Sequence, residues 1–129
     1  LKSFGKNFGM NFQLIDDAID YYSNKKILGK NTGDDFKEGK ITLPIILAYG
    51  RSNDKEKKFW ERTISDLNQN DGDFEMALEI INKYQCIEDT LTRANHFSNV
   101  AVDSVDIFKN NIYKEKLVSL VSKSVSRIY

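Results

Sequence analysis

The segment Phe12-Gln13-Leu14-Ile15-Asp16-Asp17-Ala18-Ile19-Asp20 decides the fold of this chain. At about 100° per residue, Gln13, Asp16, Asp17 and Asp20 fall on one face of a helix, within about a quarter of its circumference. Apolar residues cover the rest of the helix and flank these polar side chains closely. We therefore expect the carboxylates to point into a cleft between packed helices.

Three carboxylates held this close repel one another and raise each other's pKa unless a cation lies among them. Carboxylate oxygens without His or Cys favour Mg²⁺ over zinc, and Mg²⁺ is commonly completed by water and substrate phosphates. The residues alone therefore predict a helix-borne site for a metal-bound phosphate ester at Asp16, Asp17 and Asp20. The alternative is a solvated acidic face, which is the commoner origin of an isolated Asp-Asp-x-x-Asp pattern.

The segment that follows, residues 28–40, is rich in glycine and charge and is predicted to be a loop. It would bring Lys30 and Lys40 back towards the C-terminal end of the acidic helix, where ammonium groups could bind the oxygens of a diphosphate. A Walker-type phosphate loop is excluded. Five residues rather than four separate the last two glycines of the loop, and Ile41 stands where Ser or Thr is required.

Together these segments resemble a known family. Phe-Gln-Leu-Ile-Asp-Asp-x-x-Asp, then Gly-Lys-Asn-x-Gly-Asp-Asp, then Glu-Gly-Lys-x-Thr-Leu-Pro is similar to the second aspartate-rich motif and downstream loop of the trans-type polyprenyl diphosphate synthases. The likeness runs without a gap from about Phe12 to Pro44. A weaker likeness, which includes Arg93-Ala94 and a terminal amphipathic helix, continues to the end of the chain.

The resemblance implies a transferase of isoprenoid biosynthesis, a prenyltransferase that condenses an allylic diphosphate with isopentenyl diphosphate and uses Mg²⁺. It implies an all-α fold, the C-terminal part of an isoprenoid-synthase-type helical bundle. It assigns the metal to Asp16, Asp17 and Asp20, with Asp16 as the first candidate for a direct ligand. It places three further side chains against the allylic diphosphate, namely Gln13, Lys30 and Lys40. No nucleophile or general base is expected, because the released diphosphate can itself accept the proton.

The resemblance covers only the C-terminal portion of that family. The first aspartate-rich motif and the arginines that follow it are not found in this sequence, so we expect a fragment, a split gene product or a remnant. Such a chain holds half of the metal site and should show little turnover without an N-terminal partner; the complete enzyme is expected to form a homodimer. The alternative is a non-catalytic helical remnant or subunit. A terpene-cyclising relative is disfavoured, because its second motif usually has an Asn/Ser/Glu pattern.

Length and composition agree with a single domain over residues 1–129. The 19 basic and 19 acidic residues give zero formal net charge, so nothing indicates nucleic-acid binding. One Cys and one His exclude a disulfide framework and a Cys/His zinc site. The sequence contains no apolar run of about 18 residues and no signal-peptide pattern, so no membrane span and a cytoplasmic location are expected.

Apolar periodicity and turn signals predict about six amphipathic helices packed as antiparallel neighbours. Asn53-Asp54 and Asp73 are predicted as helix caps, and Thr42 as the cap of a helix that Leu43 and Pro44 open. The predicted helices cover residues 1–24, 43–50, 55–68, 74–84, 87–108 and 114–128.

Three single residues receive structural interpretations. Trp60 is expected to anchor the core, and Cys86 to be a buried thiol in a short connection. His96 is expected to have a structural role, since one His without neighbouring ligands makes a poor metal site.

Overall fold

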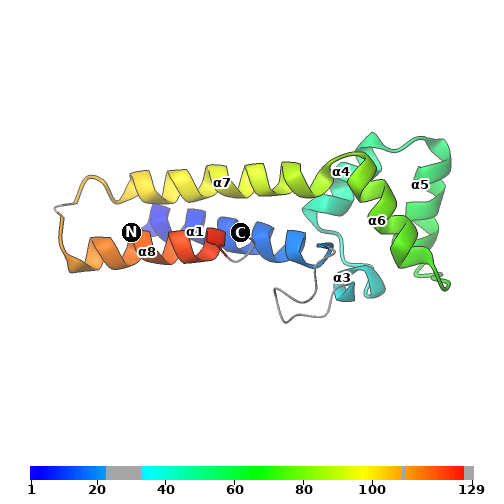
Figure 1. Cartoon of the computed structure of the whole chain (residues 1–129), viewed down its shortest axis with the longest axis horizontal. Coiled ribbons are helices and arrows are strands. Elements are labelled where there is room, and N and C mark those ends of the chain that lie inside the picture. Colours follow the sequence, from blue (N-terminus) through cyan, green and yellow to red (C-terminus); the bar gives the residue numbers. More distant parts are fainter. Residues whose placement is uncertain (23–32, 109, 127–129) are drawn as a thin grey trace. The chain divides into compact units, whose positions relative to one another are not determined.

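The computed structural model describes residues 1–22, 33–108 and 110–126, and every regular element in these ranges is helical (Figure 1). The predicted all-α fold is therefore confirmed. No helix within the described ranges combines the length and the hydropathy needed to cross a membrane. The elements are α1 (Lys2–Ile19), α3 (Asp34–Lys37), α4 (Leu43–Arg51), α5 (Asp54–Trp60), η1 (Glu61–Ser65), α6 (Asp73–Lys83), α7 (Cys86–Ser104) and α8 (Ile112–Ser126).

The chain divides into two compact units. Unit 1 comprises residues 1–16 and 91–129, and unit 2 comprises residues 17–90. The helices α1 and α7 contribute residues to both units. That residues 1–129 form one domain stays a prediction.

Unit 1 contains α8 and parts of α1 and α7, which run side by side (Figure 1). Its buried cluster consists of Phe4, Ala101, Val105 and Val121. The Phe4 and Phe8 rings stack with centroids 5.9 Å apart, as expected for residues four apart on one helix.

A buried polar contact joins these three helices. Asn11 is fully buried, and its side-chain amide donates a hydrogen bond to the Ala94 carbonyl at 2.8 Å. The Ser124 hydroxyl donates to the Asn11 side-chain oxygen at 2.9 Å. Because a buried amide must satisfy both its donor and its acceptor, Asn11 fixes the register of α1 against α7 and α8.

In unit 2, the predicted role of Trp60 is confirmed. Its side chain is 2% exposed, and its ring nitrogen donates to the Ser52 hydroxyl at 3.1 Å. The helix that carries Trp60 begins as expected, since the Asn53 side chain accepts a bond from the Glu56 backbone and the Glu56 carboxylate binds the Asn53 backbone in return. This capping box satisfies two backbone donors at the start of α5.

The predicted helix over residues 55–68 is too long. The α-helical part ends at Trp60, a π-helical turn follows, and Leu67 adopts a left-handed backbone with φ 52°. The prediction that Asp73 caps the next helix is also wrong. Gly72, with φ 88°, occupies the cap position, and Asp73 is the first helical residue, because its carboxylate accepts bonds from the Asn70 backbone and from Arg62.

Three other predictions concern helix ends. Thr42 occupies the cap position of α4, as predicted, but its hydroxyl makes no capping bond. Cys86 is fully buried, as expected, yet it begins α7 and does not lie in a connection. The helix α7 ends at Ser104, before the predicted end at residue 108.

Candidate functional site

The predicted acidic face is largely buried. Asp20, in the turn after α1, is fully buried, Asp17 is 6% exposed and Asp16 is half-buried, whereas Gln13 is exposed. Gln13 and Asp16 belong to unit 1, and Asp17 and Asp20 to unit 2. Burial of carboxylates is costly without hydrogen bonds or opposite charge, so this pattern argues against a solvated acidic face.

The structure gives Asp20 a contact that the sequence did not indicate. Its Oδ2 accepts a hydrogen bond from the backbone N–H of Asp35 at 2.8 Å, and its carbonyl accepts one from the Gly33 N–H at 3.0 Å. Gly33 is the cap residue of α3 and has no side chain to satisfy the first backbone donors of that helix. Asp20 therefore serves as a cap supplied from the turn after α1, and it fixes the start of α3.

Asp35 is a third acidic residue that, with Asp17 and Asp20, acts on the buried phenol of Tyr21. Tyr21 is 1% exposed, and its pKa is raised by burial and then by the negative charges of Asp20, Asp35 and Asp17. The phenol consequently stays protonated throughout the physiological range. Sequence reasoning did not assign a role to Asp35. The available signal was the acidic pair Asp34-Asp35 within the glycine-rich segment.

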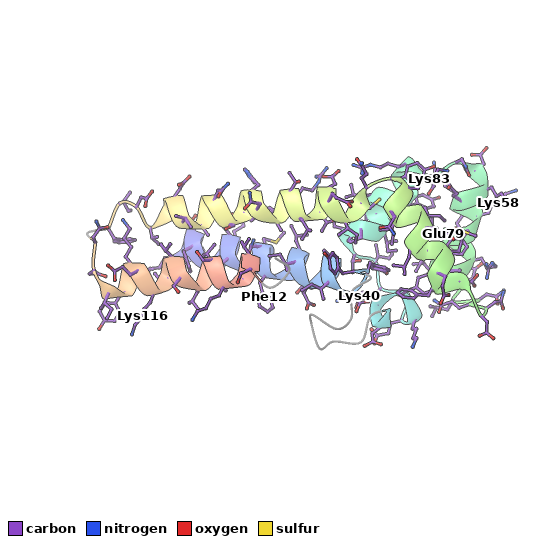
Figure 2. All side chains as sticks on the ribbon, viewed as in Figure 1. Phe12, Lys40, Lys58, Glu79, Lys83 and Lys116 are labelled. Atoms are coloured by element: carbon purple, nitrogen blue, oxygen red, sulfur yellow. The ribbon has the colours of Figure 1, made fainter. Side chains whose placement is uncertain are left out.

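Lys40 lies on the segment that Asp20 anchors. Its Nζ is 4.0 Å from Oδ1 of Asp35, and its backbone N–H donates to the Asp35 carbonyl at 2.9 Å. The Lys40 side chain is 47% exposed and is labelled in Figure 2. Contacts thus run from Asp20 through Asp35 to Lys40. Lys30 lies outside the described residues.

The donor set decides which ion could bind. Within the described ranges, no three His, Cys, Asp or Glu side chains form a group that could hold a metal ion by themselves. An ion held by one or two of these carboxylates would thus complete its shell with water and phosphate oxygens, which is the usual coordination of Mg²⁺ in proteins. All the available ligands are hard oxygen donors, so the residues present fit Mg²⁺.

The all-α fold and the aspartate-rich helix define a class of helical proteins. In this class, acidic side chains at the end of one helix contact a following segment that carries a lysine. The profile of the polyprenyl synthetase family matches residues 1–81, and the chain belongs to this family. The family resemblance read from the sequence is confirmed.

Two curated relatives illustrate the match. The chain is 35% identical over its whole length to octaprenyl diphosphate synthase of Haemophilus influenzae, and 32% identical over 99% of its length to an all-trans-nonaprenyl-diphosphate synthase of Rhodobacter capsulatus. In both cases the chain spans 39% of the relative, which corresponds to its C-terminal portion.

Two solved structures of enzymes of this family also match the chain. A polyprenyl synthase from Caulobacter crescentus, complexed with calcium and isoprenyl diphosphate, is 42% identical with a TM-score of 0.87; the match covers 96% of this chain and 38% of that one. A decaprenyl diphosphate synthase from Rhodobacter capsulatus is 33% identical with a TM-score of 0.90, over 98% of this chain and 39% of that one.

Proposed function

We propose that the chain supplies the C-terminal part of a prenyltransferase that condenses an allylic diphosphate with isopentenyl diphosphate in the presence of Mg²⁺. The observation that carries this proposal is the anchoring of the Asp35–Lys40 segment by Asp20, directly after the aspartate-rich helix. The names of the relatives support the reaction class. The calcium and isoprenyl diphosphate of the Caulobacter structure support a divalent ion and a diphosphate as ligands.

Of the three predicted metal ligands, Asp16 is the first candidate, because it is the half-buried one and can be approached from solvent. Asp17 follows it on the same helix. Asp20 already uses one carboxylate oxygen to hold the Asp35 N–H and would contribute at most the other. When bound, Mg²⁺ would stabilise the negative charge that develops on the departing diphosphate.

The chain's own side chains have distinct proposed roles. The exposed ammonium of Lys40 would bind diphosphate oxygens, and Lys30 would supply a second cation. Gln13, which is exposed on α1, would add a neutral hydrogen bond. Tyr21 does not act as a base, because its raised pKa keeps the phenol protonated. The proton released in the condensation would go to the diphosphate.

Turnover is expected to need the remaining portion of the enzyme, and the complete protein is expected to form a homodimer. A non-catalytic helical subunit is the alternative. Two apolar side chains on α1, Met10 and Phe12, are 41% and 45% exposed, which agrees with a partner on this helix under either hypothesis. Phe12 is labelled in Figure 2. Only a prenyltransferase segment would restore Mg²⁺-dependent condensation when combined with an N-terminal portion.

A chimera tests the proposal. Residues 1–129 replace the matching C-terminal portion of the Haemophilus influenzae octaprenyl diphosphate synthase, and incorporation of labelled isopentenyl diphosphate is measured with and without Mg²⁺. The expected result is Mg²⁺-dependent activity that falls about 100-fold or more in Asp16→Asn. Loss of the metal ligand should remove several kcal/mol of transition-state stabilisation. Asp71→Asn, in an exposed turn, is the matched control.

A folded chimera without activity, or an Asp16→Asn chimera with full activity, would overturn the assignment. Circular dichroism establishes that each chimera is helical before the assay.

A further inference from the structure

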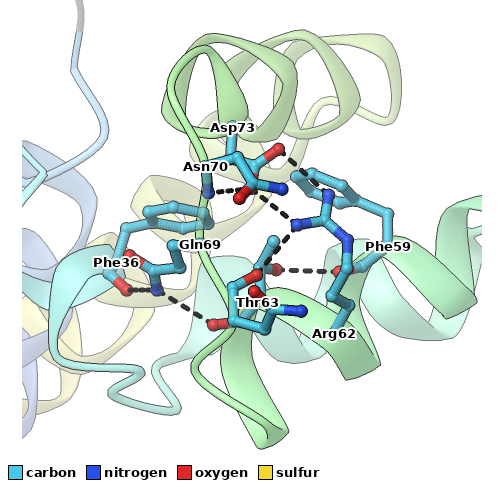
Figure 3. A network of polar contacts seen from close by, with 8 residues as sticks. Phe36, Phe59, Arg62, Thr63, Gln69, Asn70 and Asp73 are labelled. Carbon is cyan, nitrogen blue, oxygen red and sulfur yellow. Dashed lines mark hydrogen bonds and ion pairs between the residues drawn. The ribbon is translucent and has the colours of Figure 1, made fainter.

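A polar network holds the C-terminal end of α3 (Figure 3). Asp20 holds the start of the same helix. The side-chain amide of Gln69 donates one hydrogen bond to the Phe36 carbonyl at 2.7 Å and another to the Thr63 carbonyl at 2.9 Å. Phe36 belongs to α3 and Thr63 to the π-helical turn η1. One primary amide therefore joins two elements that are 27 residues apart in the sequence.

One backbone carbonyl of η1, that of Thr63, accepts the hydrogen bond from Gln69. The Glu61 carbonyl accepts the Asp66 N–H at 3.0 Å, and the Arg62 carbonyl accepts the Asn68 N–H at 2.9 Å. The next carbonyl, that of Thr63, is bonded by Gln69. The last carbonyls of a helix lack partners within the helix, so Gln69 satisfies one that the turn cannot.

The position of Gln69 is itself fixed by its neighbours in the chain. Arg62 donates to the Asn68 carbonyl at 2.8 Å and to both carboxylate oxygens of Asp73, at 2.8 and 3.0 Å. Asp73 also accepts the Asn70 N–H at 2.7 Å. The Arg62 guanidinium, which also holds the pKa of the Asp73 carboxyl below its ordinary value, makes this a charge-assisted pair. The backbone on both sides of Gln69 is therefore held in place.

Apolar packing restricts α3 further. The Phe36 ring is 2% exposed and lies 5.8 Å from the Phe74 ring, centroid to centroid. A Cβ atom at Gly33 would lie only 3.1 Å from the same Phe74 ring, so the start of α3 packs directly against it. The helix is thus held by Asp20, by Gln69 and by Phe74.

We infer that Gln69 is a positioning residue for diphosphate binding: by holding the Phe36 carbonyl it fixes α3, and with it the Asp35–Lys40 pair next to Asp20. The assignment to diphosphate rests on the proposed function. The effect on α3 rests on the contacts alone. A merely structural Gln69 would stabilise the fold without controlling the segment that carries Lys40.

Two substitutions separate these roles. Gln69→Met keeps the length of the side chain and removes the donor. Gln69→Glu keeps the shape and turns a carboxylate, which cannot donate when ionised, towards two carbonyl oxygens. The control is Asn53→Ala, which removes a helix cap elsewhere in unit 2 and is expected to cost a comparable amount of stability.

The test combines two measurements on the 129-residue chain. Amide hydrogen exchange is followed across residues 34–40, and binding of inorganic pyrophosphate in the presence of Mg²⁺ is measured by calorimetry. For Gln69→Met we expect Asp35 amide exchange to be about fivefold to tenfold faster and pyrophosphate affinity to fall by a similar factor, as for the loss of one net hydrogen bond. Gln69→Glu should exceed both changes, and Asn53→Ala should show neither.

Two outcomes would discriminate further. If Gln69→Met lowers the unfolding midpoint as Asn53→Ala does, but leaves exchange at 34–40 and affinity unchanged, the positioning role is overturned. If the unsubstituted chain binds no pyrophosphate while Gln69→Met still accelerates exchange of the Asp35 amide, the assignment to diphosphate fails and the control of α3 by Gln69 is supported.

Discussion

Gly39, directly before Lys40, is the position at which a single methyl group should disturb the lysine-bearing segment most. Its backbone is left-handed, with φ 67°, and an added Cβ would lie 2.5 Å from Cδ2 of Leu67 and 2.9 Å from the Ile64 carbonyl oxygen. The exposed Leu67 side chain can move aside. The Ile64 carbonyl belongs to the π-helical turn and can move only with the backbone.

The loss of stability in Gly39→Ala has two sources, the left-handed backbone and the contact with the Ile64 carbonyl. An alanine in the left-handed region costs about 1–2 kcal/mol. Overpacking against a backbone carbonyl adds about 1–3 kcal/mol, by analogy with insertion of an extra methyl group into a packed site. We therefore expect the free energy of unfolding to fall by about 2–5 kcal/mol in Gly39→Ala.

Gly72→Ala is the matched control, because Gly72 is also left-handed, with φ 88°, but no described atom lies within 4 Å of its added Cβ. Only the backbone term applies, so a loss of about 1–2 kcal/mol is expected. Urea unfolding followed by circular dichroism measures both variants. Equal losses in the two variants would refute the reasoning, since the contact with Ile64 would then contribute nothing. A second readout is pyrophosphate affinity, which only Gly39→Ala should weaken.

Three further substitutions test polar contacts elsewhere in the chain and at Asp20. Asp20→Ala removes the charge-assisted bond to the Asp35 N–H and should lower the free energy of unfolding by about 1.5–3 kcal/mol in urea titrations, with a smaller loss in Asp20→Asn, whose oxygen can still accept. Asn11→Ala removes two buried hydrogen bonds and leaves a cavity, so thermal unfolding should show a loss of about 2–4 kcal/mol. Hydrogen bonds from the Tyr84 hydroxyl, the backbone at residue 53 and the ammonium at residue 83 lower the pKa of Glu56 to about 2. Because this pKa lies below the ordinary 4.5, the stabilisation is present above about pH 5 and is lost as the pH falls towards 2, so Glu56→Gln should be less stable than the unsubstituted chain at neutral pH and should approach it in acid.

Each of these expectations can fail in a specific way. An Asp20→Ala chain as stable as the unsubstituted one would show that α3 does not depend on its cap from Asp20. An unchanged unfolding midpoint in Asn11→Ala would show that the polar contact between α1, α7 and α8 does not stabilise the fold. A stability difference for Glu56→Gln that is independent of pH between about 2 and 7 would contradict the lowered pKa.

Local features of the fold were predictable from the sequence. The Asn53 cap, the core position of Trp60 and the helix that carries the aspartates follow from periodicity and from side chains three or four residues apart. The error at Asp73 has a physical cause, since a residue suited to capping was drawn into an ion pair with Arg62, which no local pattern shows.

The parts of the site that escaped prediction depend on contacts distant in the sequence. Asp20 caps α3 from 15 residues away, and Gln69 reaches the Phe36 carbonyl from 33 residues away. Neither residue differs locally from an ordinary loop or helix residue of its type. The π-helical turn was equally hidden, because the contacts at its end, the Gln69 bond to the Thr63 carbonyl and the left-handed Leu67, do not follow from its own composition.

The most direct test of the central claim is a calorimetric titration of the chain with inorganic pyrophosphate, with and without Mg²⁺, on the unsubstituted chain and on Asp16→Asn. The account predicts binding that requires Mg²⁺ and weakens about tenfold or more when Asp16 loses its charge. Binding of equal strength without Mg²⁺, or in Asp16→Asn, would contradict it.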